Sequence, residues 1–177
     1  MRHTNWCAVT GAPCSGKTTV IREFERLGYN VVHEVARAYI DGELGKGKTI
    51  RQIKADIRAF EQHILNEKIA IEASLSSGET FFLDRAVPDS IAYFILEGLD
   101  PDEPLKKSKI TRYAKIFFFE RLRFEKDAVR SEDDTVATEL DRLLQESYQL
   151  LGYEIIRVPL MPVRDRVAFM LSHLQPG

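Results

Sequence analysis

The sequence predicts an α/β fold with a parallel sheet, and three observations support this prediction. Strand-like apolar runs alternate with helix-length segments along the 177 residues, a pattern typical of parallel sheets covered by helices. A complete phosphate-binding motif stands between the first such run and the first helix. The length and the 44% hydrophobic content fit one globular domain over residues 1–177. We therefore expect a three-layer domain with five parallel strands.

Five short runs rich in apolar and β-branched residues account for the strands. They occupy residues 6–10, 29–33, 80–83, 115–119 and 154–158. Their expected order in the sheet, numbered along the chain, is 2-3-1-4-5, which places the first strand at the centre.

The segments between the strands predict helices separated by polar loops. Apolar residues recur at helical spacing from Ile53 to Leu75, which predicts one long helix with a buried stripe. Further helices are expected at 17–27, 89–96, 163–174 and in a segment that ends near residue 151. Glycine, proline and charged residues fill 41–48 and 98–107, which we interpret as loops.

The phosphate-binding motif follows the pattern G-x-x-x-x-G-K-[ST] in full. Gly11 permits a sharp exit from the strand, and Gly16 lets the backbone approach phosphates closely. We expect Lys17 to reach the β- and γ-phosphates of a nucleoside triphosphate and Thr18 to ligate Mg²⁺. Backbone amides and the helix N-terminus supply the remaining attraction for the anion. The predicted nucleotide-binding residues are Gly11, Ala12, Pro13, Cys14, Ser15, Gly16, Lys17, Thr18 and Thr19.

Charged residues gather where the second and third expected strands end, and ligands of open α/β sheets bind beyond the carboxyl ends of strands. Asp84 follows an apolar run, as expected of an acid that orders Mg²⁺. Arg85 can contact a transferred phosphoryl group through its bidentate fork. Glu34 is the candidate base for an acceptor hydroxyl, and Arg37 the candidate for an anionic part of the acceptor. A plain strand-end acid is the alternative for Asp84, and a surface ion pair is the alternative for Arg85.

The segment from Arg121 to Glu132 carries several basic residues among acids. Basic residues on a lid can neutralise charge that develops on a transferred phosphoryl group, and Arg123 and Arg130 are the candidates for this catalytic role. A solvated helix laced with salt bridges is the alternative.

Composition argues against several classes of partner. The formal net charge of −2 gives no large basic field, so we expect no nucleic-acid substrate. No apolar stretch approaches membrane-spanning length, and there is little room for a signal peptide before the phosphate-binding motif. Two cysteines are too few for a disulfide framework. These features predict a cytoplasmic protein with no membrane contact.

The sequence resembles the NadR-like AAA-type ATPase/kinase family, whose best-understood members carry a ribosylnicotinamide kinase domain. The resemblance rests on the phosphate-binding motif, on the runs 28–37, 82–85 and 151–159, and on the pattern Asp127-x-x-Arg130-x-Glu132. More distantly the layout is similar to deoxynucleoside kinases, and that likeness implies the roles already given to Glu34, Asp84 and Arg85. Cys14 departs from the pattern, since a glycine is common there in the family.

These observations together favour an ATP- and Mg²⁺-dependent enzyme that transfers a phosphoryl group to a small, nucleoside-like hydroxyl acceptor. The alternative is an NTP-binding switch or an ATPase that acts on a partner protein. A polynucleotide kinase is a third interpretation, which the acidic balance weakens. The identity of the acceptor, the preference for ATP over GTP and the oligomeric state stay open at this level.

Overall fold

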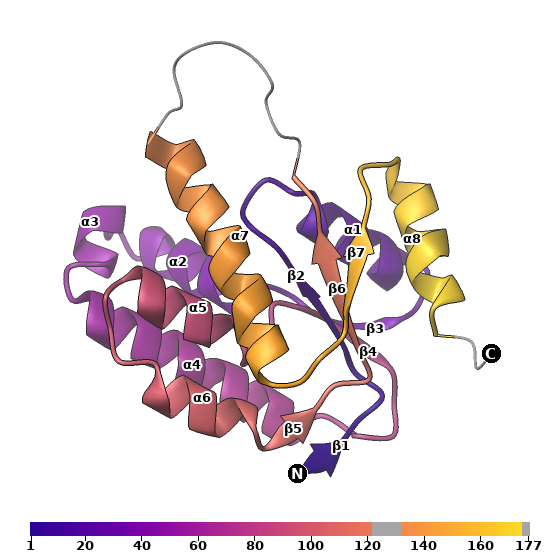
Figure 1. Cartoon of the computed structure of the whole chain (residues 1–177). Coiled ribbons are helices and arrows are strands. Elements are labelled where there is room, and N and C mark those ends of the chain that lie inside the picture. The colour runs from indigo at the N-terminus through magenta and orange to yellow at the C-terminus, as the bar shows by residue number, and fades with distance from the viewer. Residues whose placement is uncertain (122–131, 175–177) are drawn as a thin grey trace.

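The central sheet has five parallel strands in the order β3-β4-β2-β6-β7, as seen in a computed structural model that describes residues 1–121 and 132–174 (Figure 1). This is the order expected from the sequence. The five strands are β2 (Cys7–Thr10), β3 (Asn30–Val32), β4 (Phe81–Asp84), β6 (Lys115–Phe119) and β7 (Ile155–Val158). A separate two-stranded parallel ladder joins β1 (Arg2–His3) to β5 (Thr111–Arg112); strands this short leave no readable period in the sequence.

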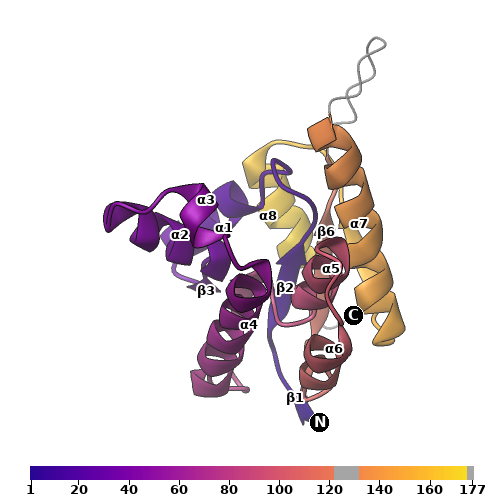
Figure 2. The same cartoon turned by 90° about the vertical axis from the view of Figure 1, so that its left-hand side faces the viewer.

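Both faces of the sheet are covered, and alternate residues of β2 show it. Cys7 and Val9 belong to a core cluster with residues of α1 (Lys17–Arg26) and α8 (Val163–Ser172). Trp6 and Ala8 belong to a cluster on the opposite face, under α7 (Glu132–Leu150). The helix α5 (Asp89–Leu96) packs beside α7 on that second face. The result is the predicted three-layer arrangement, visible in the two perpendicular views (Figures 1 and 2).

The expected loop at 41–48 is wrong over its first part, because α2 (Val35–Gly45) continues through it. Each of its glycines costs about 1 kcal/mol relative to alanine in a helix, so side-chain contacts must help to hold this end. The carboxylate of Glu43 is almost fully buried and pairs with Lys46 at 2.7 Å and with Lys48. These two local ion pairs connect the last turn of α2 to the residues that follow it, an effect that the glycine-rich composition conceals.

The expected long helix is two helices, α3 (Ile50–Ile53) and α4 (Ile57–Ser74). A new N-cap at Asp56, whose carboxylate accepts from the Ala59 amide at 2.9 Å, starts α4 and leaves Ile53 on the shorter helix. Both pieces still bury their apolar residues against α2.

The expected loop at 98–107 contains a helix, α6 (Asp102–Ser108). Pro101 is its N-cap and Pro104 lies in its first turn, where proline is tolerated. Acidic residues occupy the first turn and lysines the last, in the sense that the helix dipole favours. None of the helices among the described residues is both long and apolar enough to cross a lipid bilayer.

Parallel pairing brings the carboxyl ends of β2 and β4 side by side at one edge of the sheet. Val9 pairs with Asp84, and the Arg85 amide donates to the Val9 carbonyl oxygen at 3.0 Å. The chain leaves β2 through Gly11, whose φ is +128° and which lies directly against Phe119 of β6. The phosphate-binding motif therefore begins where β2 ends, directly beside the end of β6.

We predict that Gly11→Ala is strongly destabilising. A Cβ atom at this position would come within 2.6 Å of the Phe119 carbonyl oxygen, on a backbone conformation unfavourable to any L side chain. Strain and overpacking together should cost on the order of 3 kcal/mol of unfolding free energy, measured by urea denaturation. Gly42→Ala in α2 is the matched control, because nothing lies within 4 Å of its added Cβ. The control should be neutral or stabilising, and equal losses in both variants would contradict the prediction.

Candidate functional site: a phosphate-binding loop beside a charged strand edge

The loop between β2 and α1 has the backbone conformation that its sequence requires. Gly16 is the N-cap of α1 with φ of 86°, and Cys14 has a positive φ of 62°. A positive φ is rare for residues other than glycine, which explains physically why glycine suits the position of Cys14. Backbone amides beside a helix N-terminus, in such a conformation, are an arrangement that can bind an anion.

Lys17, the first residue of α1, is 5% exposed and folds back over the loop. Its Nζ donates to the Ala12 carbonyl oxygen at 2.8 Å and to the Ser15 hydroxyl at 3.1 Å. The pKa of Lys17 is lowered to about 8, chiefly by burial and also by the nearby Arg85 cation. An anion on the loop would relieve both effects, so the lysine is ready to exchange its carbonyl partner for a phosphate oxygen.

Thr18 and Asp84 lie together, as predicted for a metal site. The Thr18 hydroxyl donates to Asp84 Oδ2 at 2.9 Å, while the buried Asp84 Oδ1 has no hydrogen-bond partner among the described residues. Burial raises the pKa of Asp84, and the neighbouring Glu34 raises it further. An orphaned carboxylate oxygen beside a hydroxyl suits Mg²⁺, which takes few protein ligands and keeps several waters. Within the described residues no group of three or more histidine, cysteine, aspartate or glutamate side chains is placed to hold a metal.

Arg85 is a buried cation surrounded by acidic partners. Its Nε donates to Glu34 Oε1 at 3.0 Å, and its Nη1 lies 3.4 Å from Asp89 Oδ1. The guanidinium also lies over the Tyr93 ring, 5.3 Å from its centroid. Burial by itself would lower the pKa of Arg85. The nearby Tyr93, Glu34 and other acidic groups outweigh burial, so the pKa is raised. The residue has a positive φ of 68°, so its backbone is strained.

Asp89 links Arg85 to the end of β2 and to α7, a role that the sequence did not reveal. This fully buried carboxylate accepts from the Thr10 hydroxyl at 2.7 Å, from the Ala86 amide at 3.0 Å and from the Tyr148 hydroxyl. Thr10 ends β2 and Tyr148 lies on α7. An acid in the first turn of a helix is the only local signal, and it does not reveal these distant partners.

The remaining predicted residues have different outcomes. Arg37 does not join the site: its side chain is 76% exposed and pairs with Asp41 one turn along α2. Arg123 and Arg130 lie outside the described residues. Arg121 is described and pairs with two acids of α7.

Two contacts to the loop were not foreseen at all. Arg166 of α8 donates to the Ser15 carbonyl oxygen at 2.7 Å, and Asp141 of α7 accepts from the Ala12 amide at 2.7 Å. Both residues follow the loop by more than 100 positions, so no local pattern announces them.

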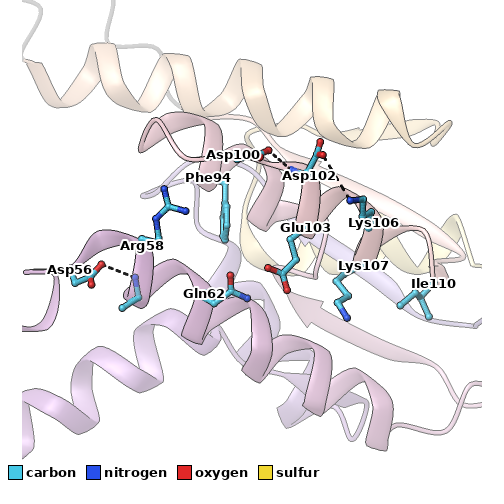
Figure 3. Close-up of a pocket in the computed structure, with 11 residues that line it drawn as sticks. Asp56, Arg58, Gln62, Phe94, Asp100, Asp102, Glu103, Lys106, Lys107 and Ile110 are labelled. Carbon is cyan, nitrogen blue, oxygen red and sulfur yellow. Dashed lines mark hydrogen bonds and ion pairs between the residues drawn. The ribbon is translucent and has the colours of Figure 1, made fainter.

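A cavity of about 840 Å³ lies elsewhere, between α4, α5 and α6 (Figure 3). Positively charged, negatively charged and uncharged polar side chains line it, including Arg58, Gln62, Glu103 and Lys107, together with the ring of Phe94. Neither the loop nor the charged strand ends contribute to its wall. We therefore place the candidate site at the loop, where anion-binding amides, a lysine and the strand-end charges converge.

Comparison with known proteins places the chain in a family. Residues 6–166 match a family model described as an AAA domain. The chain belongs to this AAA-domain family. No curated protein matches it in sequence.

Several solved structures are similar to this chain in fold. The NadR protein in complex with NAD and AMP-PNP is similar with a TM-score of 0.71 at 17% identity, over 98% of this chain and 50% of NadR. This chain thus spans about half the length of NadR. Thymidylate kinase from Ehrlichia chaffeensis gives 0.70 at 12% identity, over 98% and 100% of the two chains. Deoxyadenosine kinase from M. mycoides, with dCMP and dCDP bound, gives 0.62 at 15% identity, over 96% and 97%. The fold is that of P-loop kinases, as the sequence resemblance implied.

We predict that triphosphate binding takes up protons near pH 8. An anion beside Nζ favours the charged lysine, so binding should raise the pKa of Lys17 from about 8. At about pH 8.5 a substantial fraction of a proton should be taken up, and at about pH 7 little, because Lys17 is already charged there. Calorimetric titrations with Mg·ATP in buffers of different ionisation enthalpy measure this number. Equal heats in all buffers at the higher pH would contradict the prediction.

Proposed function

We propose that this protein transfers a phosphoryl group from ATP, with Mg²⁺, to a hydroxyl of a small, nucleoside-like acceptor. One observation carries the proposal: the Thr18–Asp84 pair and the Arg85–Glu34 pair lie at the same sheet edge as the phosphate-binding loop. The first pair suits the metal and the triphosphate. The second suits the transferred group and the acceptor.

The loop accounts for triphosphate binding. Its amides and the N-terminus of α1 attract the phosphates, and Lys17 supplies a charge that burial leaves poorly solvated. Such preorganised charge is worth more in a water-poor site than in bulk solvent. Thr18 and Asp84 would hold Mg²⁺, which when bound neutralises charge on the β- and γ-phosphates.

Glu34 is the proposed partner of the acceptor. Its side chain is 26% exposed, so it is reachable, and Arg85 fixes one of its oxygens. As the acceptor oxygen forms a bond to the γ-phosphorus, the bond from that phosphorus to the bridging oxygen breaks, and ADP leaves. The acceptor hydroxyl proton passes to the Glu34 carboxylate. Arg85 is held by Glu34 and Asp89, and its guanidinium would contact the transferred phosphoryl group beside Glu34.

We predict that Asp84→Asn weakens the dependence of ATP binding on Mg²⁺. The substitution preserves shape but removes the charge that would attract the cation. The enhancement of ATP affinity by Mg²⁺ should fall on the order of tenfold, while affinity without metal should be unchanged or higher. Titrations with and without Mg²⁺ measure both values. Asp41→Asn, at an exposed acid on α2, is the control, and an Mg²⁺ enhancement in Asp84→Asn equal to that of the wild type would refute this role.

We predict that Glu34→Gln reduces acceptor-stimulated turnover but leaves Mg·ATP affinity nearly unchanged. Glutamine can still accept from Arg85 but is a poor proton acceptor. General-base assistance is worth about 10²–10⁴-fold, and a loose transition state needs less of it. The measurement is ADP release across a panel of nucleosides that includes nicotinamide riboside. Glu25→Gln removes a surface charge that pairs with His33 and should match the wild type.

Two outcomes of this assay separate the alternatives. If an acceptor stimulates both the wild type and Glu34→Gln equally, Glu34 is not the base although the kinase function stands. If no acceptor stimulates the wild type, an NTP-binding switch or an ATPase acting on a partner protein replaces the proposed function.

A further inference from the structure

Ala12, at the start of the phosphate-binding loop, is held through both of its backbone polar groups, which belong to the two successive peptide groups on either side of its Cα. Its amide donates to Asp141 Oδ1 at 2.7 Å, and its carbonyl oxygen accepts from Lys17 Nζ at 2.8 Å. Ala12 itself is fully buried. The backbone of this one residue thus connects α7 to the loop lysine.

Asp141 brings a negative charge to a loop that must receive an anion. Its side chain is 18% exposed, so solvent screens this charge only in part. Arg121 cancels it: the Nε of Arg121 donates to Asp141 Oδ2 at 2.9 Å. The acid therefore keeps its acceptor for the Ala12 amide without presenting a free charge to the loop.

Arg121 is itself fixed in place by further contacts. Its Nη1 donates to Asp134 Oδ1 and its Nη2 to the Thr138 hydroxyl, each at 3.0 Å. With the bond to Asp141, three nitrogens of the guanidinium are used along one face of α7. A fork held in this way presents its charge at a fixed place, which a lysine cannot do as well.

We infer that Asp141 and Arg121 are positioning residues for the triphosphate: Asp141 fixes the backbone of Ala12, whose carbonyl oxygen holds Lys17 over the loop, and Arg121 neutralises Asp141. This inference rests on the proposed function, because it concerns how the loop accepts ATP. On this inference neither residue needs to contact the triphosphate. Asp141 acts through Ala12, and Arg121 acts through Asp141.

A double-mutant cycle tests this connection through calorimetric titration with Mg·ATP. Arg121→Met leaves the Asp141 charge uncompensated and should weaken binding on the order of tenfold. Asp141→Asn keeps an acceptor for the Ala12 amide and should change affinity by about twofold. The double variant Arg121→Met/Asp141→Asn should recover to within about threefold of the wild type. Recovery on removing the second charge is the result that a merely structural role would not produce.

Further variants keep the test decisive if Arg121→Met does not fold. Arg121→Lys retains the charge and should stay within about threefold of wild-type affinity. Asp141→Leu removes the acceptor, so affinity should fall about tenfold and the Ala12 amide proton should move upfield in the NMR spectrum of the free protein. Asp141→Asn should leave that resonance near its original position. Glu139→Gln, which removes an exposed charge of α7 that pairs with Arg142, is the matched control and should bind like the wild type.

The possible failures are distinguishable. If the wild type binds Mg·ATP but Arg121→Met and Asp141→Leu bind equally well, the inference is overturned and the proposed function stands. A loss in Arg121→Met that Asp141→Asn does not repair also overturns it, because Arg121 would then act directly on the nucleotide. If the wild type itself binds no Mg·ATP, the proposed function fails and the inference fails with it.

Discussion

The buried cation of Arg85 is the interaction on which the strand edge depends. A charge inside a protein is tolerated only when it is paired and hydrogen-bonded, and removing one partner costs about 3–5 kcal/mol. The partners of Arg85 come from the end of β3 and from the start of α5. Through Asp89 the same network reaches Thr10 of β2 and Tyr148 of α7. The relative positions of the loop, the strand ends and α7 therefore depend on electrostatics as well as on packing.

Local patterns predicted the parts of the fold whose cause is local. The five strands and the phosphate-binding loop follow from apolar runs, from glycine positions and from the motif itself, whereas the strand order is that of the fold which the family resemblance implied. Thr18 and Asp84 lie in contact, Thr18 through the motif at the start of α1 and Asp84 through its place at the end of β4. Their role toward Mg²⁺ stays a prediction. The end of α2 and the helix α6 were missed, since glycines and prolines usually break helices. The Glu43 ion pairs hold the former, and the first-turn position of Pro104 makes the latter possible.

The supports of the loop could not be predicted, because they come from elements far along the chain. Arg166 contacts Ser15 and Asp141 contacts Ala12 only after α7 and α8 have packed on opposite faces of the sheet. Each is one charged residue on a helix rich in charged residues. The motif predicts which backbone binds phosphate, but tertiary packing decides which side chains hold that backbone.

The exposure of Cys14 on the phosphate-binding loop has a practical consequence. The chain has two cysteines, and their settings are opposite: Cys7 is buried in β2, where burial raises the pKa of its thiol to about 12, whereas Cys14 is exposed on the loop. A thiol reagent applied to the folded protein will therefore label Cys14 and spare Cys7. Since Cys14 lies within the backbone arch that would surround the phosphates, the labelling rate gives a native, site-specific signal of whether the loop is occupied.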